Sequence, residues 1–384
     1  MVIPDNRDER RTYTGPAPLF GPAPAAVLEG LAAFPREVEV HVLSCLREPA
    51  PAPRKLAENI HFHGLRVPRW SGLKCLYLPQ ILAVRRGVRS LNPDVVHGQG
   101  TERYCALAAV WSGRPALLTI HGNMRAVAAA LGASKWSFHG LTAGLEEHAL
   151  NRSEGVVCPS QYTQRQVGAA APRTWVVPNA VSGEYFIPRS ATPSEIRLLC
   201  PALICRYKNQ NTFIRAMDPI AAEKDVRLIF AGNLDGGPYG EEFKRLISER
   251  PWCQYLGNVD AASLKVEYAA STMVVLPSLE DNCPMTILEA MAMSIPVAAG
   301  AAGGIPELVS HGSTGYLFDP RNGDDIRDKM NVALHSLPRL AEMGRAARIR
   351  AEEVFKPEVI AMRHLDIYRE TKSEANASHA ASFS

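Results

Sequence analysis

Asp281 and Glu289 are the acidic residues whose surroundings are most typical of a ligand site. Asp281 lies in a polar loop, and Glu289 lies inside an apolar helix that we predict over residues 283–293. Asn282 is a suitable N-cap, and Pro284 is tolerated in the first turn because N–H groups there have no intrahelical partner. Those free N–H groups attract phosphate. Two carboxylates flanking such a helix start can hold sugar hydroxyls on either side of a diphosphate.

Glu289 has a second interpretation. Leu288, Ala290 and Met291 surround it in the sequence, so its side chain is expected to be largely buried. A carboxylate rarely enters a protein core without a partner. That partner is either a ligand or a neighbouring side chain, and the sequence leaves both interpretations open.

Two cations stand just before another predicted helix. Arg206 and Lys208 follow a strand predicted over residues 196–204. The helix after them begins at Asn209, and the helix dipole disfavours cations at this end. Their presence therefore favours an anion between them, although two exposed surface cations would give the same pattern.

Two histidines are predicted at the carboxyl ends of strands. His97 follows Val95 and Val96, and His121 follows a strand over residues 116–120; a glycine comes directly after each histidine. Ligands bind at this edge of open α/β sheets. A histidine at a strand end is also commonly structural, so both roles remain open.

The start of the chain is unusual for an α/β protein, which normally opens with a hydrophobic strand. Here a charged run follows Met1–Ile3, so we expect a truncated first strand, from a late start codon or from real loss. The loop over residues 13–24 carries Gly15 and Gly21 before a helix predicted over residues 25–34. A glycine-bearing loop at a helix start can approach an acceptor or a diphosphate. A plain Pro-rich connection is the alternative.

Short apolar strands alternate with helices along most of the chain, which is typical of parallel α/β sheets. The predicted strands lie within residues 37–45, 60–67, 93–100, 116–120, 156–160, 175–179, 196–204, 226–232, 254–257, 273–276 and 295–299. Some of these segments, including 93–100, end in the polar loop or turn that follows the strand. The predicted helices include residues 25–34, 76–91, 209–217, 283–293, 338–355 and 359–371. The acidic pair, the cations and the histidines therefore belong at the ligand edges of such sheets.

The length of 384 residues suggests two domains rather than one. We predict an N-terminal domain over residues 1–186 and a second domain, which restarts the α/β pattern, over residues 187–355. A last helix is expected over residues 356–372. The Ser- and Ala-rich residues 373–384 are expected to be disordered.

Composition narrows the class of protein. Hydrophobic residues make up 46% of the chain, which is enough for full-sized cores, and a net charge of +3 does not demand nucleic acid as a partner. The eight cysteines are scattered without a CxxC pair, so we expect reduced core thiols in a cytoplasmic protein and no zinc site. The N-terminus does not resemble a signal peptide, and no apolar run is long enough to span a membrane.

Arg85, Arg86 and Arg89 form a basic cluster on the helix predicted over residues 76–91. A solvated helix face is the simplest interpretation. The other is a patch that contacts an anionic membrane, which would make the protein peripheral to the inner face of that membrane.

The residues around the acidic pair also resemble a known family. The C-terminal signature of family 4 glycosyltransferases is similar to DNCPMTILEAMAMSIPV (281–297), GGIPELV (303–309) and TGYLFDP (314–320). The segment that closes the N-terminal domain in that family is similar to PNAV (178–181). The resemblance implies the α/β GT-B fold, in which two Rossmann-like parallel-sheet domains face a cleft and the last helix crosses back onto the first domain.

The resemblance assigns roles to the acidic pair. The family places an acidic residue, usually Glu, then seven residues, then a second Glu; here these positions are Asp281 and Glu289. Glu280 is adjacent but one step out of register. By this resemblance Asp281 orients the donor sugar and Glu289 binds the ribose hydroxyls.

The resemblance also covers the cations and one histidine. In the family an Arg and a Lys clamp the donor diphosphate; Lys208 matches the Lys, Leu203 stands at the Arg position, and Arg206 is the candidate substitute. A family histidine near the donor sugar and acceptor matches His121. The implied donor-binding residues are Asn282, Cys283, Pro284, Met285, Thr286, Gly232, Gly257 and Val259, and the acceptor-side residues are Gly15, Gly21 and His97.

The resemblance implies a retaining glycosyltransferase that uses a nucleotide diphosphate-sugar as co-substrate, without a metal or another cofactor. The acceptor would be a glycan or a lipid-linked molecule, as in polysaccharide or glycolipid biosynthesis. Two alternatives stay open at this point. One is a non-catalytic GT-B scaffold that binds a sugar nucleotide, and the other is a GT-B epimerase that acts on the free sugar nucleotide.

Overall fold

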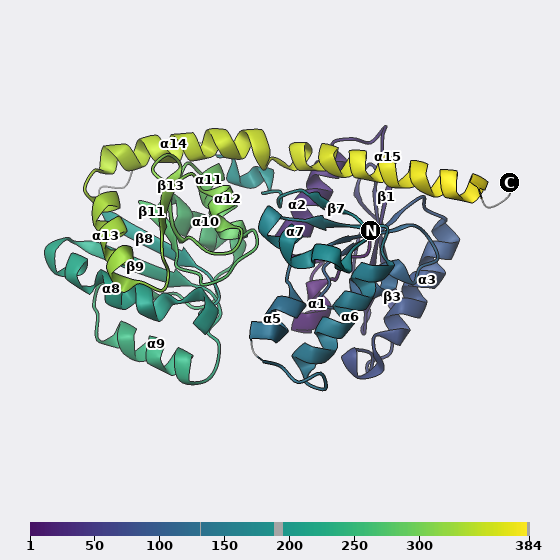
Figure 1. Ribbon diagram of the computed structural model, residues 1–384, viewed down its shortest axis with the longest axis horizontal. Helices are drawn as coiled ribbons and strands as arrows, with labels where there is room; N and C mark the ends of the chain where they lie inside the picture. Colours follow the sequence, from purple (N-terminus) through teal and green to yellow (C-terminus); the bar gives the residue numbers. More distant parts are fainter. Residues whose placement is uncertain (131, 188–194, 382–384) are drawn as a thin grey trace. The chain divides into compact units, whose positions relative to one another are not determined.

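A computed structural model describes the chain over residues 1–130, 132–187 and 195–381. The chain divides into two units (Figure 1). Unit 1 combines Met1–Ala180 with Pro357–Ser384, and unit 2 is the continuous segment Val181–Lys356. The division falls at Val181, before the boundary at residue 187 that we predicted, and the C-terminal helix belongs to unit 1.

Unit 1 is built on a mostly parallel sheet. Its strands are β1 (Val40–Leu46), β2 (Lys55–Ala57), β3 (Ile60–Arg66), β4 (Val96–Gln99), β5 (Ala116–Thr119), β6 (Gly155–Cys158) and β7 (Thr174–Val176). They form two groups, β2-β3-β1 and β4-β5-β6-β7, in which β2 pairs antiparallel with β3 and the other neighbours pair in parallel. Val2 joins the groups through parallel bridges to Leu43 of β1 and Gly98 of β4.

The short first strand therefore lies inside the sheet. The Val2 N–H donates to the His97 carbonyl at 2.8 Å, and the Ile3 N–H donates to the Leu43 carbonyl at 3.2 Å. Val2 and Ile3 are fully buried. The segment that the sequence suggested to be truncated is thus paired on both sides.

Helices cover both faces of this sheet (Figure 1). They are α1 (Asn6–Arg10), α2 (Pro22–Ala32), α3 (Leu78–Leu91), α4 (Tyr104–Val110), α5 (Met124–Ala130), α6 (Phe138–Arg152), α7 (Gln161–Val167) and α15 (Pro357–Ala381), with 3₁₀ turns η1 (Leu73–Cys75) and η2 (Gly168–Ala170). One core includes Val84 of α3 and Leu118 of β5, and the other includes Val27 of α2 and Ile360 of α15.

The last helix is longer than predicted. α15 continues to Ala381, so residues 373–381 are helical where we predicted disorder, and residues 382–384 lie outside the described ranges. The tail is rich in Ser and Ala, which we took as a disordered composition. Alanine has the highest intrinsic helix propensity, and it lets the helix extend.

Unit 2 has a fully parallel sheet. Its strands are β8 (Ile196–Pro201), β9 (Val226–Ala231), β10 (Cys253–Tyr255), β11 (Met273–Leu276), β12 (Val297–Gly300) and β13 (Gly315–Phe318). Their order is β10-β9-β8-β11-β12-β13. This is the doubly wound order of Rossmann sheets, in which the direction of winding reverses between β8 and β11.

The helices of unit 2 lie on both faces of that sheet (Figure 1). They are α8 (Gln210–Glu223), α9 (Pro238–Ser248), α10 (Ala261–Ala269), α11 (Met285–Ala292), α12 (Ile305–Leu308), α13 (Gly323–Leu334) and α14 (Leu337–Val354), with 3₁₀ turns η3 (Gly183–Tyr185) and η4 (Arg206–Lys208). Phe213 of α8 and Met330 of α13 are in one core, while Ile287 of α11 and Ala347 of α14 are in the other.

The helix that carries Glu289 begins later than predicted. α11 starts at Met285, and its N-cap is Pro284, with φ −68° and ψ 123°. Asn282 is therefore not the N-cap. A proline disfavours the α conformation in the residue before it, which keeps Cys283 out of the helix.

Candidate functional site

In unit 2, the loops that carry the candidate site residues all lie at one edge of the sheet. Lys208 follows β8, Asp281 follows β11 and Gly303 follows β12. Gly232 and Gly257 follow β9 and β10. Because these strands are parallel, all five loops leave at their carboxyl ends, around the β8–β11 switch point where open α/β sheets bind ligands.

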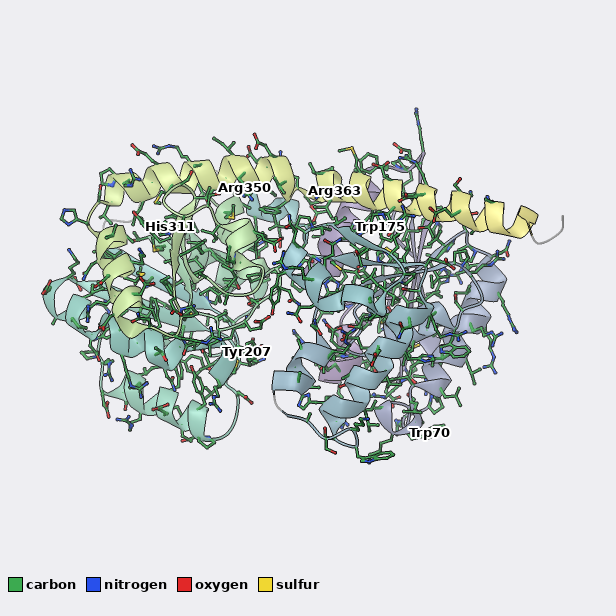
Figure 2. All side chains as sticks on the ribbon, in the orientation of Figure 1. Trp70, Trp175, Tyr207, His311, Arg350 and Arg363 are labelled. Carbon is green, nitrogen blue, oxygen red and sulfur yellow. The ribbon has the colours of Figure 1, made fainter. Side chains whose placement is uncertain are left out.

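Lys208 and Asp281 form the charged centre of this edge. The Lys208 Nζ donates to the Asp281 Oδ2 at 2.5 Å, and the two side chains are 15% and 16% exposed. The Leu279 N–H donates to the Tyr207 carbonyl at 2.8 Å, so the two loops run together. The Lys208 ammonium also lies 5.3 Å from the centre of the Tyr207 ring, which Figure 2 labels. A part-buried ammonium that can exchange a carboxylate for another anion suits a diphosphate.

Arg206, the candidate substitute for the family Arg, differs from Lys208 in its surroundings. It is an exposed residue at the start of η4. Leu203, at the family's Arg position, is 39% exposed. Asn209, with φ +61°, ends the turn, and its side chain donates to the Pro320 carbonyl at 2.6 Å. This turn directs Lys208 toward Asp281.

Gly303 holds the Asp281 loop in place. It has φ +60°, and a Cβ on it would lie 2.0 Å from the Asp281 carbonyl oxygen. The N–H of Gly304 donates to that same oxygen at 2.7 Å. The close approach is therefore between this glycine and the backbone of Asp281.

Gly303→Ala is therefore expected to displace the Asp281 loop. The added methyl group meets backbone and takes an unfavourable φ, so we expect unit 2 to lose about 2 kcal/mol or more of stability. A lower Tm and a lower kcat/KM would be measured together. Gly323→Ala is the matched control, because a Cβ on Gly323 has open space. Equal behaviour of the two variants would contradict the assigned contact.

Glu289 is a buried carboxylate on α11. It is 7% exposed, and its Oε2 accepts a hydrogen bond from the Tyr268 hydroxyl at 2.8 Å. Burial raises the pKa of Glu289 to about 7, while the hydrogen bond from Tyr268 opposes this rise. A carboxylate held in this way is costly to ionise and is available to hydroxyl donors that stabilise its charge.

Tyr268 is a partner of Glu289 that sequence reasoning missed. It lies on α10, is fully buried, and meets the Tyr185 ring edge-on at 6.1 Å between centroids. Tyr268 is thus the neighbouring side chain that pairs with Glu289, which is one of the two interpretations that the sequence left open. Nothing in the spacing of the sequence connects Tyr268 with Glu289, because the two helices lie on separate crossovers.

The predicted donor-binding residues at the start of α11 also hold local structure. The Thr286 Oγ1 donates to the Pro201 carbonyl at 2.9 Å, which ties α11 to the end of β8. Cys283 and Pro284 are buried, and Met285 and Asn282 are partly exposed. The start of α11 therefore lies at the same edge as Lys208.

Gly232 and Gly257 join the loops after β9 and β10. The Gly232 N–H donates to the Gly257 carbonyl at 2.8 Å, and the Tyr255 hydroxyl donates to the Gly232 carbonyl at 2.8 Å. A Cβ on Gly232, at φ +149°, would lie 2.2 Å from the Ala202 carbonyl oxygen. Val259 is partly exposed just beyond them. These contacts give the two glycines a structural role that does not depend on donor binding.

In unit 1, His121 lies where it was predicted, just after β5. Its Nε2 is 3.0 Å from the Gln99 Oε1. Burial lowers the pKa of His121, and the Glu102 carboxylate acts in the opposite direction. Glu102 also accepts a hydrogen bond from the Gly122 N–H at 2.5 Å, which joins the loops after β4 and β5.

His97 was predicted at a strand end, and this position is wrong. It is the second residue of β4 and is 2% exposed. The strand continues beyond it because the Gln99 N–H still pairs with the Val2 carbonyl at 2.9 Å. His97 lies inside the sheet, with its Nδ1 2.7 Å from the Tyr368 hydroxyl of α15.

A cavity of about 470 Å³ opens at the carboxyl edge of the unit 1 sheet. Gln80 of α3 lines it, is 4% exposed, and has no hydrogen-bond partner for its Oε1 within the described ranges. Three cations, Arg11, Arg47 and Arg103, also line it. Pro4, Cys45 near the end of β1, Glu102 after β4 and Met124 at the start of α5 line it as well. Four carboxylates, Asp5, Asp8, Glu9 and Glu102, are among the lining groups, and Arg47 and Arg103 are paired with Asp8 and Glu9. The unpaired Gln80 carbonyl and these charged groups give the cavity the chemistry to bind a hydroxyl-bearing molecule.

The two predicted acceptor-side glycines do not line this cavity. The Gly15 carbonyl accepts a hydrogen bond from the Arg7 Nη1 at 2.7 Å, and Gly21 precedes α2 with φ −63°. Arg7 is itself held by a buried ion pair with Asp5 at 2.7 Å. The structure therefore gives Gly15 and Gly21 the role of a Pro-rich connection.

Known families match both units. Residues 25–184 match the model described as Glycosyltransferase Family 4, and residues 189–350 match Glycosyl transferases group 1. The chain belongs to the family 4, group 1 glycosyltransferases. The α/β GT-B fold implied by the sequence is confirmed with it.

Relatives of this glycosyltransferase extend over both units. It is 25% identical over 334 residues to the GDP-mannose-dependent alpha-(1-6)-phosphatidylinositol monomannoside mannosyltransferase of Mycobacterium tuberculosis, covering 77% of this chain and 86% of that one. It is 33% identical over 132 residues to the sulfoquinovosyl transferase SQD2 of Arabidopsis thaliana, covering 34% of this chain and 25% of that protein. The structure of Anabaena Alr3699/HepE in complex with UDP-glucose has a TM-score of 0.70 and 18% identity, covering 97% and 99% of the two chains.

None of the described helices of this glycosyltransferase combines the length and the apolar character that a membrane-crossing segment requires. Of its eight cysteines, seven are buried and Cys75 is partly exposed, and all eight are free thiols. The prediction that the cysteines lie in the cores is confirmed for the seven.

Proposed function

We propose that this glycosyltransferase moves a sugar from a nucleotide diphosphate-sugar to a glycan or lipid-linked acceptor, with retention of the anomeric configuration. The observation that carries the proposal is the 2.5 Å pair of Lys208 and Asp281 beside the switch point of the unit 2 sheet. Doubly wound sheets bind nucleotides at this edge. The GDP-mannose-dependent relative and the fold neighbour solved with UDP-glucose are precedents for the donor class.

The chemistry follows from where charge develops. Breaking the anomeric C–O bond leaves negative charge on the departing diphosphate, and Lys208 is the cation that would meet it. Asp281, released from Lys208 by the diphosphate, would accept hydrogen bonds from hydroxyls of the donor sugar. Glu289 would accept them from the ribose. In this proposal no metal is required, and the acceptor attacks from the face on which the phosphate leaves.

Thermal unfolding with UDP, GDP, ADP and CMP tests the donor site. A ligand at about 100 times its Kd adds about 2.7 kcal/mol of stability, and each kcal/mol raises Tm by about 2–4 °C for units of 150–250 residues. We expect one nucleotide to raise Tm and Glu289→Ala to abolish the shift. If none of the four does so, the site assignment is wrong.

The same nucleotide then identifies the donor for a transfer assay. The anomeric proton coupling in the NMR spectrum of the product reports its configuration. A product with the configuration of the donor supports retention, and an inverted product contradicts it.

An exposed apolar surface in unit 1 suggests where the acceptor comes from. We call it the apolar rim: Trp70, Leu76, Leu78, Trp136 and Phe138, which are 70%, 53%, 55%, 88% and 57% exposed. Figure 2 shows Trp70 projecting from unit 1. The rim comes from two loops that border the same cavity, since Tyr77 and Phe138 both line it. Large exposed aromatic side chains are typical of surfaces that enter a membrane interface.

The charge of the surrounding chain favours an anionic partner. Residues 59–93 contain no Asp or Glu, and neither do residues 103–145. The cations of the first segment are Arg66, Arg69, Lys74, Arg85, Arg86 and Arg89. Along α3, Leu78, Leu82, Arg86 and Arg89 are all exposed, so the apolar and basic side chains share its outer face. We therefore propose peripheral contact with an anionic bilayer and a lipid-linked acceptor.

Liposome flotation of the full chain tests this surface. Replacing Arg85, Arg86 and Arg89 by Ala removes about 1 kcal/mol of attraction per cation, so the partition constant on anionic vesicles should fall on the order of a hundredfold. Trp70→Ser with Trp136→Ser should weaken binding as well. Val266→Ser, an equally exposed apolar site in unit 2, is the control. If the arginine and tryptophan variants float as wild type does, the membrane proposal fails.

A further inference from the structure

A chain of buried polar groups lies beneath His121 in unit 1. The His121 Nε2 is 3.0 Å from the Gln99 Oε1, and the Gln99 Nε2 is 3.3 Å from the His97 Nε2. The His97 Nδ1 in turn is 2.7 Å from the Tyr368 hydroxyl. The chain therefore connects the loop after β5 with α15, across 271 positions of sequence between His97 and Tyr368.

The interior of this chain is shielded from water. His97 and Gln99 are each 2% exposed, and Thr119, whose hydroxyl is 2.7 Å from the His97 Nε2, is 5% exposed. Burial and the neighbouring His364 lower the pKa of His97 well below its usual value. His97 is therefore neutral, so one ring nitrogen donates and the other accepts.

The hydrogen bonds of this chain link His121 with α15. An amide oxygen only accepts, so His121 donates from its Nε2 to the Gln99 Oε1. That orientation of the Gln99 amide turns its NH₂ group toward the His97 ring, 3.3 Å from Nε2 and 3.4 Å from Nδ1. The Thr119 hydroxyl, which can donate or accept, lies at the His97 Nε2, and the Tyr368 hydroxyl lies at the His97 Nδ1. A change at Tyr368 can therefore reach Gln99 and His121 by way of the His97 ring, because a histidine tautomer is set by the bonds of its two nitrogens.

We propose that Tyr368 and Gln99 are positioning residues that hold His121 as the Nε2–H tautomer in one ring orientation. α15 is then a part of the site as well as of the fold. The consequence for activity rests on the proposed function, in which His121 lies near the donor sugar and the acceptor. The positioning itself does not depend on that function and is measured separately.

The test uses ¹⁵N NMR of the histidine side chains and steady-state kinetics of the full chain. In Gln99→Leu we expect the His121 ¹⁵N shifts to move from the Nε2–H pattern to a mixture of tautomers, with kcat lowered about tenfold and KM changed less than twofold. Tyr368→Phe, which removes only a hydroxyl, should shift both readouts in the same direction by a smaller amount. It also keeps the test available if Gln99→Leu does not fold.

Thr371→Val is the matched control. Thr371 is a buried residue of α15 whose hydroxyl bonds to the Ile367 carbonyl, outside the chain of polar groups. It should lower Tm without moving the His121 signals. Unchanged His121 signals in both Gln99→Leu and Tyr368→Phe would overturn the proposal. Altered signals with unchanged kcat would support the positioning and contradict a role of His121 in transfer.

Discussion

Lys208→Ala is expected to lower kcat about a hundredfold or more while unit 2 stays folded. The lost ammonium is the group placed to meet the charge of the departing diphosphate, and removing one such stabilising group typically costs 10²–10³ in kcat, about 2.7–4 kcal/mol. The fold should survive because both Lys208 and Asp281 keep access to water. Initial rates with the donor identified by thermal unfolding would measure the loss.

Three further variants sharpen this result. Lys208→Arg should restore activity only in part, since a planar guanidinium does not reproduce a compact ammonium. Lys244→Ala is the control, because Lys244 is an exposed cation paired with Glu241 on α9. Arg206→Ala decides whether Arg206 substitutes for the family Arg: a loss above tenfold would show that it does. Near-wild-type kcat in Lys208→Ala would contradict the assigned clamp.

Donor affinity is expected to fall by about tenfold for each pH unit below about 7. In the free protein, burial raises the pKa of Glu289 to about 7. Ribose hydroxyls donate to the ionised carboxylate, so binding favours that form and lowers the pKa. Below pH 7 the carboxyl group must therefore lose a proton before the donor binds, and above pH 7 the affinity should be constant. Calorimetric titration between pH 5.5 and about 8 measures this.

Glu289→Gln should remove this pH dependence and weaken binding at pH 8 at least tenfold, about 1.4 kcal/mol. Stability of the unliganded protein gives an independent check. Because the folded pKa of Glu289 is raised from 4.5 to about 7, the folded state holds the extra proton in that interval, and its stability falls as pH rises through it. Relative to wild type, the free energy of unfolding of Glu289→Gln should therefore increase as the pH rises from 4.5 to about 7. If Glu289→Gln keeps the pH dependence, a group other than Glu289 is responsible for it.

Much of the donor edge could be predicted from the sequence, because its residues sit in loops that follow strongly apolar strands. Lys208, Asp281 and Gly303 fall at the carboxyl ends of β8, β11 and β12, and a parallel sheet gathers such ends. Spacing alone could not reveal that Lys208 and Asp281 form an ion pair. It also could not select Tyr268 as the partner of Glu289, since that contact depends on how two crossover helices pack.

The errors have equally local causes. His97 was placed at a strand end because a polar, glycine-containing segment follows Val95 and Val96, but pairing with the first strand carries β4 through to Gln99. Asn282 was chosen as an N-cap by residue type, whereas the restriction that Pro284 imposes on Cys283 moves the helix start. Propensity and pattern describe one segment at a time. These positions were decided by a neighbouring residue or strand.

The return of α15 to unit 1 has a consequence for synthesis of the chain. Unit 2 is one continuous segment, whereas unit 1 needs both ends of the sequence. A Cβ on Gly30 of α2 would lie 2.0 Å from the Pro357 carbonyl oxygen, so α15 sits directly on a helix made more than three hundred residues earlier. While the ribosome is still translating unit 2, Ile360 has not been made and the core that it shares with Val27 stays open. Unit 2 can therefore complete its fold first. Until α15 has been made, unit 1 stays incomplete and exposes an apolar surface of the kind that chaperones bind.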